Sequence, residues 1–154
     1  MENIKYLKPL VYDIEAMQSL VAPEVEKGLI LYRSASEMAT TIRSYIVAKD
    51  GDKIVGFVAL HIHSVTLAEV RSLIVKEEYR KHGIGRQLVK QALNEASVLG
   101  LKEVLTLTYH KNLFENLGFH EITKESIPEQ KIWADCIRCK HFPICDEVSL
   151  IIKL

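Results

Sequence analysis

The sequence predicts a mixed α/β (α+β) fold, in which helices cover both faces of a sheet. Two observations lead to this prediction. β-rich runs stand both before and after the helical runs, and residues 45–49 and 53–61 are joined by Asp50-Gly51-Asp52, the strongest hairpin signal in the chain. Residues 85–99 show a clear amphipathic helical pattern. A chain of 154 residues is expected to form one domain, spanning residues 1–154.

The elements ahead of the hairpin follow from local patterns. Residues Ile4–Leu7 alternate apolar and polar side chains, as a short strand does. Apolar residues then recur at helical spacing from Asp13 until Gly28 stops the run. Ser36 is expected to begin a second short helix with an incomplete cap, because Ala39 rather than an acidic residue stands three positions later.

The elements after the hairpin alternate between strands and helices. Leu67–Val75 and Glu103–Thr108 are β-rich runs on either side of the amphipathic helix. Residues 111–117 predict a short helix that Gly118 closes. Residues 147–154 predict the last strand.

The composition is that of a globular protein without a dominant charge. Twenty basic and twenty acidic side chains cancel, which argues against a nucleic-acid partner. No apolar run approaches the ~20 residues of a membrane span, and the charged first residues lack the apolar stretch of a secretory signal. A cytoplasmic location is therefore expected, with the three cysteines reduced or bound to a metal.

The most informative junction lies between the strand that ends near Val75 and the amphipathic helix, where the sequence reads Arg80-Lys81-His82-Gly83-Ile84-Gly85-Arg86. Helix N-termini leave backbone N–H groups unpaired and carry a partial positive charge, so they attract phosphate. The two glycines permit close backbone approach, and the three basic side chains add counter-charge. This junction therefore predicts a phosphate-binding turn.

Two glycines alone would favour a simpler interpretation, a tight connection with no ligand. The order of strand, Arg-x-x-Gly-x-Gly and amphipathic helix favours the phosphate-binding turn instead. A kinase-type P-loop is excluded because no Gly-Lys-Ser/Thr follows. A dinucleotide fold would normally have three glycines directly after the strand and an acidic residue ~20 positions later, and both are missing.

The segment at residues 80–85 resembles the acetyl-CoA signature of the GNAT superfamily of N-acetyltransferases, Arg/Gln-x-x-Gly-x-Gly/Ala after the fourth strand. Residues 113–119, Leu-Phe-Glu-Asn-Leu-Gly-Phe, resemble the later helix of that superfamily and its Leu-Gly-Phe exit. Two motifs at the expected separation are more specific than either alone, and the resemblance covers residues 45–119. It implies a GNAT-type fold, with a mixed, mostly antiparallel sheet of six to seven strands and helices on both faces. It also implies an N-acetyltransferase with acetyl-CoA as co-substrate.

Within the superfamily the chain is most similar to the short, stand-alone bacterial N-acetylglutamate synthases. Four stretches carry this similarity: Leu31-Tyr32-Arg33-Ser34, Glu69-Val70-Arg71-Ser72-Leu73, Leu107-Thr108-Tyr109-His110, and the tail from Trp133 to Glu147. The resemblance implies direct transfer of an acetyl group to the α-amine of L-glutamate in a ternary complex, a step of arginine biosynthesis.

The resemblance also implies a set of cofactor-binding residues. The backbone of Leu73, Ile74 and Val75, splayed from its neighbour strand, would pair with the pantetheine amides, and one N–H there would polarise the acetyl carbonyl. The turn and one aromatic residue complete the expected set: Arg80, Lys81, His82, Gly83, Ile84, Gly85, Arg86 and Phe114.

Amine chemistry at neutral pH calls for a base, because an α-amine with a pKa of about 8 or above is mostly protonated. Glu69 stands six residues before the strand end at Val75, where the superfamily often carries a catalytic glutamate. We expect it to act as the base, directly or through a water. The alternative is a solvent-facing strand carboxylate.

The general acid departs from the common pattern. Many superfamily members place a tyrosine four residues before the exit glycine, and this chain has Phe114 there. Either the thiolate leaves without a dedicated acid, or Tyr109 or a water substitutes. His110 is another polar group nearby, but a lone histidine is more often structural.

Arg33 and Arg71, with Ser34 beside the first, are the expected substrate-binding residues, because guanidinium matches carboxylate bidentately. Arg71 lies two residues beyond Glu69, so both project from one face of a regular strand. The alternatives are an ion pair between Arg71 and Glu69, and Arg33 as an ordinary surface cation.

The tail holds a potential Cys3His zinc site made of Cys136, Cys139, His141 and Cys145. One Cys-x-x-Cys pair has metal-like spacing, but the remaining ligands sit very close in sequence. Packing residues or free thiols are the favoured interpretation, and zinc the less favoured one.

Several rival functions stay open at the level of sequence. The enzyme could acetylate another amine, such as a peptide N-terminus, a polyamine or an antibiotic. The missing tyrosine at Phe114 also leaves room for a non-catalytic acetyl-CoA-binding sensor. Exposed strand edges make a homodimer a reasonable expectation.

Overall fold

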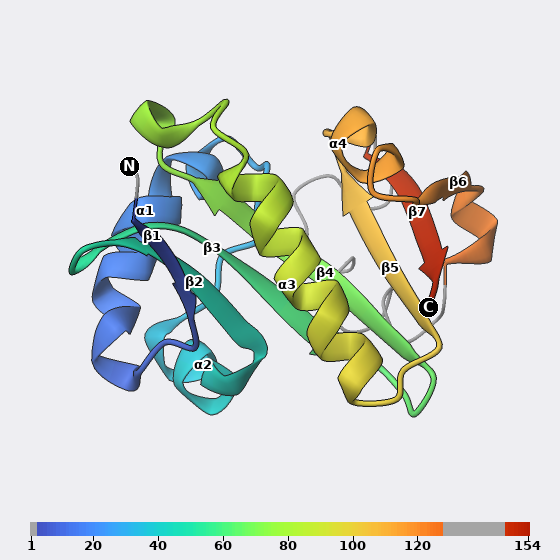
Figure 1. Ribbon diagram of the computed structural model, residues 1–154, viewed down its shortest axis with the longest axis horizontal. Coiled ribbons are helices and arrows are strands. Elements are labelled where there is room, and N and C mark those ends of the chain that lie inside the picture. The colour runs from blue at the N-terminus through green and yellow to red at the C-terminus, as the bar shows by residue number, and fades with distance from the viewer. Residues whose placement is uncertain (1–2, 128–146) are drawn as a thin grey trace.

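The computed structural model describes residues 3–127 and 147–154, and its centre is one twisted sheet (Figure 1). Within the described residues the sheet has seven strands in the order β1-β2-β3-β4-β5-β7-β6. Among these strands β4 and β5 run parallel, and the other neighbours are antiparallel. The predicted mixed, mostly antiparallel sheet is thereby confirmed.

The bounds of the elements agree closely with the sequence patterns. The strands are β1 (Ile4–Leu7), β2 (Tyr45–Asp50), β3 (Lys53–Ile62), β4 (Leu67–Val75), β5 (Glu103–Thr108), β6 (His120–Ile122) and β7 (Val148–Lys153). The helices are α1 (Ile14–Glu26), α2 (Ala35–Thr40), α3 (Ile84–Val98) and α4 (Lys111–Glu115). Short 3-10 helices occur at Val11–Asp13, Ile42–Ser44, Glu77–Tyr79 and Lys124–Ser126. None of the described helices is long and apolar enough to cross a membrane.

Helices cover both faces of the sheet, as predicted. On one face α3 packs its apolar side against the strands, and Leu88 and Val89 are fully buried there with Val70 and Val104. On the other face α1 and α2 cover a second cluster of buried residues. Figure 1 shows α3 lying along the sheet over β3 and β4. Because side chains alternate along each strand, they pack into two separate cores, one on each face of the sheet.

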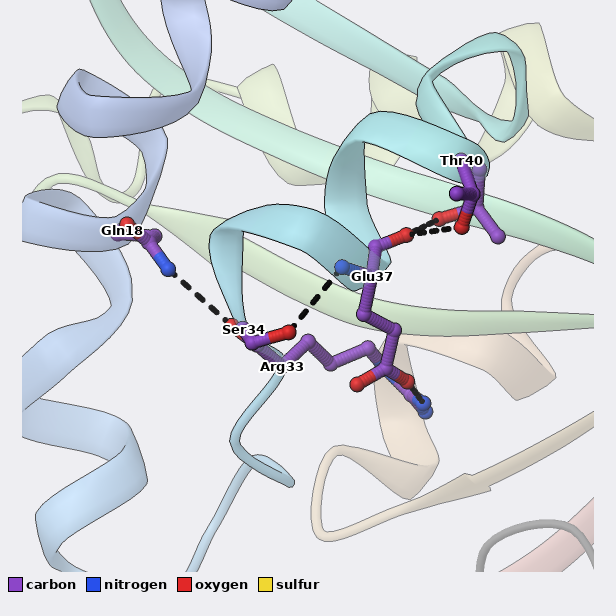
Figure 2. A network of polar contacts seen from close by, with 6 residues as sticks. Gln18, Arg33, Ser34, Glu37 and Thr40 are labelled. Atoms are coloured by element: carbon purple, nitrogen blue, oxygen red, sulfur yellow. Dashed lines mark hydrogen bonds and ion pairs between the residues drawn. The ribbon is translucent and has the colours of Figure 1, made fainter.

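Helix α2 begins at Ala35, and its N-cap lies two residues before the predicted start at Ser36. The N-cap is Ser34, whose Oγ accepts a hydrogen bond from the backbone N–H of Glu37 at 3.1 Å (Figure 2). Ser34 and Glu37 have the Ser-x-x-Glu spacing of a capping box, so the expectation of an incomplete cap at Ser36 was wrong. The sequence prediction placed the start of the helix at Ser36, whereas Ser34 is the capping residue.

Strand β6 was not predicted as an element of its own. It contains three residues, His120–Ile122, and pairs antiparallel with β7. A run this short carries no periodic signal in the sequence, because strand recognition needs about four to eight alternating residues. Its place is set by pairing with β7 rather than by local preference.

Gly56→Ala tests the packing of β3 beneath α3. A Cβ at Gly56 would lie 2.8 Å from the carbonyl oxygen of Ile74 and 3.3 Å from Cδ1 of Leu88. Because the backbone oxygen cannot move aside, we expect the variant to lose about 1–3 kcal/mol of unfolding free energy, the usual cost of overpacking. Urea denaturation measures this loss.

Gly85→Ala is the matched control for Gly56→Ala. Its Cβ would meet Cγ2 of Val75 at an ordinary 3.6 Å, and alanine is favoured over glycine in a helix by up to ~1 kcal/mol. We expect its stability to stay level or rise. Equal stabilities of the two variants would contradict the packing described.

Candidate functional site

The candidate site begins where β4 and β5 part. The register between them covers three residue pairs, from Leu67 opposite Glu103 to Glu69 opposite Leu105. Both strands continue further, β4 as far as Val75 and β5 as far as Thr108. Figure 1 shows the two strands diverging toward the end of the sheet at which α3 begins. Within the described part of the chain, the β5 side of residues 71–75 therefore has no strand partner.

A buried side chain closes the branch point between the two strands. Thr106 is 2% exposed, and its Oγ1 donates a hydrogen bond to the carbonyl oxygen of Val70 at 2.9 Å. The carbonyl of Val70 is the first on β4 beyond the residues that pair with β5. The hydroxyl of Thr106 gives it a hydrogen-bond partner, and a buried carbonyl without one would cost about 1–3 kcal/mol. The parting of the strands is thus built into the sheet, and it matches the splayed strand that the resemblance implied for residues 73–75.

A β-bulge on the other side of β4 marks the same position. Phe57 pairs with Ile74 and Ala59 with Arg71, so Val58 alone stands opposite two residues of β4. Ser72, one of these two, has a φ of 59°, a left-handed conformation that is rare for a residue other than glycine. Bulges re-aim backbone and side-chain groups and are common next to active sites. Ser72 therefore lies on β4 between the edge that parts from β5 and the edge that pairs with β3.

The predicted phosphate-binding turn is a tight connection into α3. Gly83 is the N-cap of α3 with a φ of 81°, and Lys81 also has a positive φ of 67°. Lys81, His82 and Gly83 are exposed, as is the Arg86 side chain in the first turn of α3. Unpaired N–H groups and positive charge therefore meet at the start of this helix. This is the geometry that the sequence predicted for a phosphate site.

Arg80 anchors the turn to the rest of the fold. Its Nε donates a hydrogen bond to the carbonyl oxygen of Val75 at 2.9 Å, and its Nη2 lies 3.7 Å from Oε1 of Glu24 on α1. The arginine thus ties the end of β4 to α1 across the turn. Its expected contact with a cofactor phosphate stays a prediction.

A cavity of about 390 Å³ lies between α1, residues 30–33 and the sheet. Its walls are mainly apolar, and Ser72 of the bulge belongs to its lining. The lining residues are Gln18, Ser19, Val21, Ala22, Val25, Glu26, Ile30, Leu31, Tyr32, Arg33, Met38, Tyr45, Phe57 and Ser72. The cavity therefore reaches β4 on the face opposite α3, at the position where the strand is bulged.

Arg33 belongs to the wall of this cavity. Its side chain is 8% exposed, so the alternative of an ordinary surface cation is wrong. Its Nη1 lies 3.0 Å from Oε2 of Glu37, and its carbonyl oxygen accepts a hydrogen bond from Gln18 Nε2 at 3.3 Å (Figure 2). Ser34 caps α2 beside it. The loop that carries Arg33 is thus held between α1 and α2.

Arg33 and Arg71 act on the same tyrosine. Burial raises the pKa of the Tyr45 phenol, and the positive charges of Arg33 and Arg71 act in the opposite direction. Tyr45 and Arg33 both line the cavity, and Tyr45 stands in one cross-strand row with Ala59 and Arg71. The structure therefore brings together two arginines that are 38 positions apart in the sequence, on the side of the sheet that α1 covers.

Glu69 is buried on the same face. It is 1% exposed, so the alternative of a solvent-facing carboxylate is wrong. Its Oε1 lies 2.9 Å from Nε2 of His63, whose side chain is 2% exposed. The sequence singled out Glu69 but missed His63, although the alternation of a strand puts His61 and His63 on one face.

The remaining predicted residues lie near the far end of β5. Tyr109 directly follows β5 and is 38% exposed. Phe114 is 2% exposed and packs edge-on against Phe119, with ring centroids 5.2 Å apart. The backbone N–H of His110 donates to Oγ1 of Thr108, at the start of α4. The catalytic role of Tyr109 and the cofactor contact of Phe114 stay predictions.

The predicted zinc ligands Cys136, Cys139, His141 and Cys145 lie outside the described residues. Across residues 3–127 and 147–154, no group of three or more His, Cys, Asp or Glu side chains is arranged to hold a metal ion. The zinc hypothesis therefore stays untested.

Comparison with known proteins identifies the family. The model of the acetyltransferase (GNAT) domain matches residues 41–121, more than half of the chain. An uncharacterized N-acetyltransferase from Chlorobaculum tepidum is 38% identical over 139 residues, which cover 90% of this chain and 89% of that protein. The chain belongs to the GNAT acetyltransferase family. The predicted acetyltransferase class is thereby confirmed.

Other GNAT relatives have more specific names. An amino-acid acetyltransferase from Mycobacterium tuberculosis is 32% identical over 113 residues, covering 71% of this chain and 64% of that protein. An N-acetylglutamate synthase from Neisseria gonorrhoeae, solved in complex with coenzyme A and N-acetyl-glutamate, superposes with a TM-score of 0.85 at 20% identity. That superposition covers 99% of this GNAT chain but 35% of the synthase, so the likeness concerns the fold of one part of the synthase.

Gly83→Val tests the turn as the phosphate site. A side chain at this left-handed N-cap would distort the turn and project where phosphate is expected, since among the described residues no atom beyond its chain neighbours lies within 4 Å of its Cβ. We expect the dissociation constant of acetyl-CoA, measured by isothermal titration calorimetry, to rise at least about tenfold, a loss of ~1.4 kcal/mol.

Gly51→Val is the matched control for Gly83→Val. Gly51 lies in the β2–β3 hairpin with a φ of 63° and open space around its Cβ, so the backbone strain is similar. We expect a similar loss of stability and unchanged acetyl-CoA affinity. Equal affinities of the two variants would remove the turn from the binding site.

Proposed function

We propose that the chain transfers the acetyl group of acetyl-CoA to the α-amine of L-glutamate, giving N-acetylglutamate, by direct attack in a ternary complex. The observation that carries the proposal is the pair of arginines: Arg33 lines the cavity together with Tyr45, and Arg71 stands on β4 next to Ser72 of the bulge. The names of the amino-acid acetyltransferase relative and of the Neisseria N-acetylglutamate synthase support the same choice of acceptor.

The two substrates approach β4 from different sides. Acetyl-CoA would place its diphosphate at the turn before α3 and its pantetheine along residues 73–75, where β4 has parted from β5. The acceptor would occupy the cavity beneath α1, which reaches β4 at Ser72. The reacting atoms then meet at the bulge, where a backbone N–H of residues 73–75 can stabilise the oxyanion.

The reaction itself is an acyl transfer. The amine nitrogen attacks the carbonyl carbon of the thioester, the C–S bond breaks, and the thiolate leaves with the electron pair and takes up a proton. The amine loses its proton to Glu69, directly or through a water. Tyr109 or a water supplies the proton to the thiolate.

The two arginines suit the carboxylates of an amino-acid substrate. A guanidinium carries five N–H donors, so Arg33 can hold Glu37 and a substrate carboxylate at the same time. The mostly apolar wall of the cavity lowers the local dielectric and strengthens such a contact. Arg71, next to the bulge on β4, would bind the other carboxylate of glutamate.

A second candidate, acetylation of a polyamine, is favoured by the acidic groups of the same region. Glu26 lines the cavity, and Glu37 lies 3.0 Å from Arg33. These carboxylates would suit an acceptor that carries a second ammonium group.

An assay of CoA release against a panel of amino acids and polyamines separates the two candidates and a non-catalytic acetyl-CoA-binding sensor. Tight acetyl-CoA binding without turnover of glutamate would sink the glutamate proposal.

Arg33→Gln tests the acceptor side of the site. Removing a charged hydrogen-bond donor from a carboxylate costs about 1.5–3 kcal/mol, so we expect the KM for glutamate to rise about 10- to 100-fold. The dissociation constant of acetyl-CoA should stay unchanged. Arg43→Gln, at an exposed arginine in Ile42–Ser44, is the control and should leave both constants unchanged. Equal effects of the two variants would remove Arg33 from the acceptor site.

Glu69→Gln tests the base. Below the pKa of the amine we expect turnover to fall by about 10²- to 10⁴-fold, because a positioned base contributes that much. Above that pKa the amine is already deprotonated, so the variant should approach the wild-type rate. The measurement is kcat/KM as a function of pH. A profile identical to that of the wild type would exclude Glu69 as the base.

A further inference from the structure

His63 and Glu69 form a buried polar pair, of which the proposed reaction uses only Glu69. Oε1 of Glu69 lies 2.9 Å from Nε2 of His63, and the side chains are 1% and 2% exposed. The His61 ring stands edge-on to the His63 ring, with centroids 4.7 Å apart. The three residues come from β3, from the segment directly after it, and from β4.

A carboxylate at this position needs a donor. Burial without a hydrogen bond disfavours the ionised form and raises the pKa of a carboxyl group, whereas hydrogen bonds to the charged form lower it. On the β5 side the register partner of Glu69 is Leu105, whose fully buried side chain is apolar. His63 is therefore in hydrogen-bonding contact with a carboxyl group that is shielded from solvent.

The tautomer of His63 follows from the charge of its partner. In the role of a base Glu69 is ionised, and an ionised carboxylate only accepts hydrogen bonds, so this role requires the proton of the contact on Nε2 of the histidine. The backbone N–H of His63 donates to the carbonyl oxygen of Leu67 at 2.9 Å, which holds the residue in the turn between β3 and β4. The histidine is thus fixed from the backbone as well as through its ring.

Other charged or titratable groups share this face of the sheet. His61 is the cross-strand partner of Glu69, and Arg71 follows two residues later on β4. Glu103 of β5 pairs with Leu67 and lies two residues before Leu105. The two histidines and the carboxylate do not make a metal site, because no described group of such residues has that arrangement. The pair is therefore a hydrogen-bonded one.

We propose that His63 is a positioning residue for Glu69: its Nε2–H orients the buried carboxylate and keeps it ionised at neutral pH. The consequence for catalysis rests on the proposed function, in which Glu69 takes the proton of the amine. In that step the proton passes from the amine nitrogen to the carboxylate, directly or through a water, while the Nε2 proton stays on His63. The histidine is neither an acid nor a base in the reaction.

The test compares two substitutions at one position. His63→Leu removes the donor, so the pKa of the Glu69 carboxyl rises and the base is protonated to a higher pH. We expect the acidic limb of kcat/KM, measured with whichever amine the wild type turns over best, to move up by at least about one pH unit. His63→Gln retains an N–H donor and should bring the limb back toward its wild-type position.

Controls separate positioning from general damage. His120→Leu, at an exposed histidine of β6, should leave the profile unchanged. Thermal unfolding and acetyl-CoA affinity report whether each His63 variant is folded. A limb that moves equally in His63→Leu and His63→Gln, or in neither variant, would overturn the proposal.

A direct titration distinguishes failure of this proposal from failure of the proposed function. The ¹³C chemical shift of the Glu69 carboxyl, followed against pH in the free protein, should show a higher pKa in His63→Leu than in the wild type. If that rise occurs while Glu69→Gln leaves turnover unchanged, the pairing stands and the assignment of the base fails. An unmoved carboxyl titration contradicts the role of His63 whatever the acceptor is.

Discussion

The early end of the β4–β5 pairing is the constraint on which the rest of the site depends. Three residue pairs join the strands, and beyond Glu69 they separate, with the Thr106 hydroxyl holding the carbonyl oxygen of Val70 at the branch. A continuous ladder would consume the backbone groups of residues 71–75. Because β4 leads into the turn before α3, the parted strand edge and the helix N-terminus lie along one path, as an elongated phosphate-bearing cofactor requires.

Side chains of β4 reach both faces of the sheet. Val70 points into the core beneath α3, whereas Glu69 and Arg71 project toward the side that α1 covers. The bulge at Ser72 interrupts this alternation next to the cavity. A single strand thereby carries the carboxylate, one arginine and the backbone groups, so their spacing is set by the sheet and not by mobile loops.

Local patterns sufficed for most of the fold and for the residue types of the site. The hairpin, α3 and the glycine turn were predictable because their signals lie within a few neighbouring residues. The bulge at Ser72 and the contact between His63 and Glu69 depend on the register of β3 against β4, which no single stretch of sequence contains. The contact between Arg33 and Glu37 was not predictable from helical spacing, because Arg33 lies just before the N-cap Ser34 and outside α2.

Amide hydrogen exchange of β4 with and without coenzyme A tests the central claim most directly. The account predicts new protection at residues 73–75 and at the first turn of α3, and no change at residues 67–69, which β5 already pairs. Protection confined to other parts of the chain, with residues 73–75 exchanging as fast as before, would contradict the parted strands as the cofactor site.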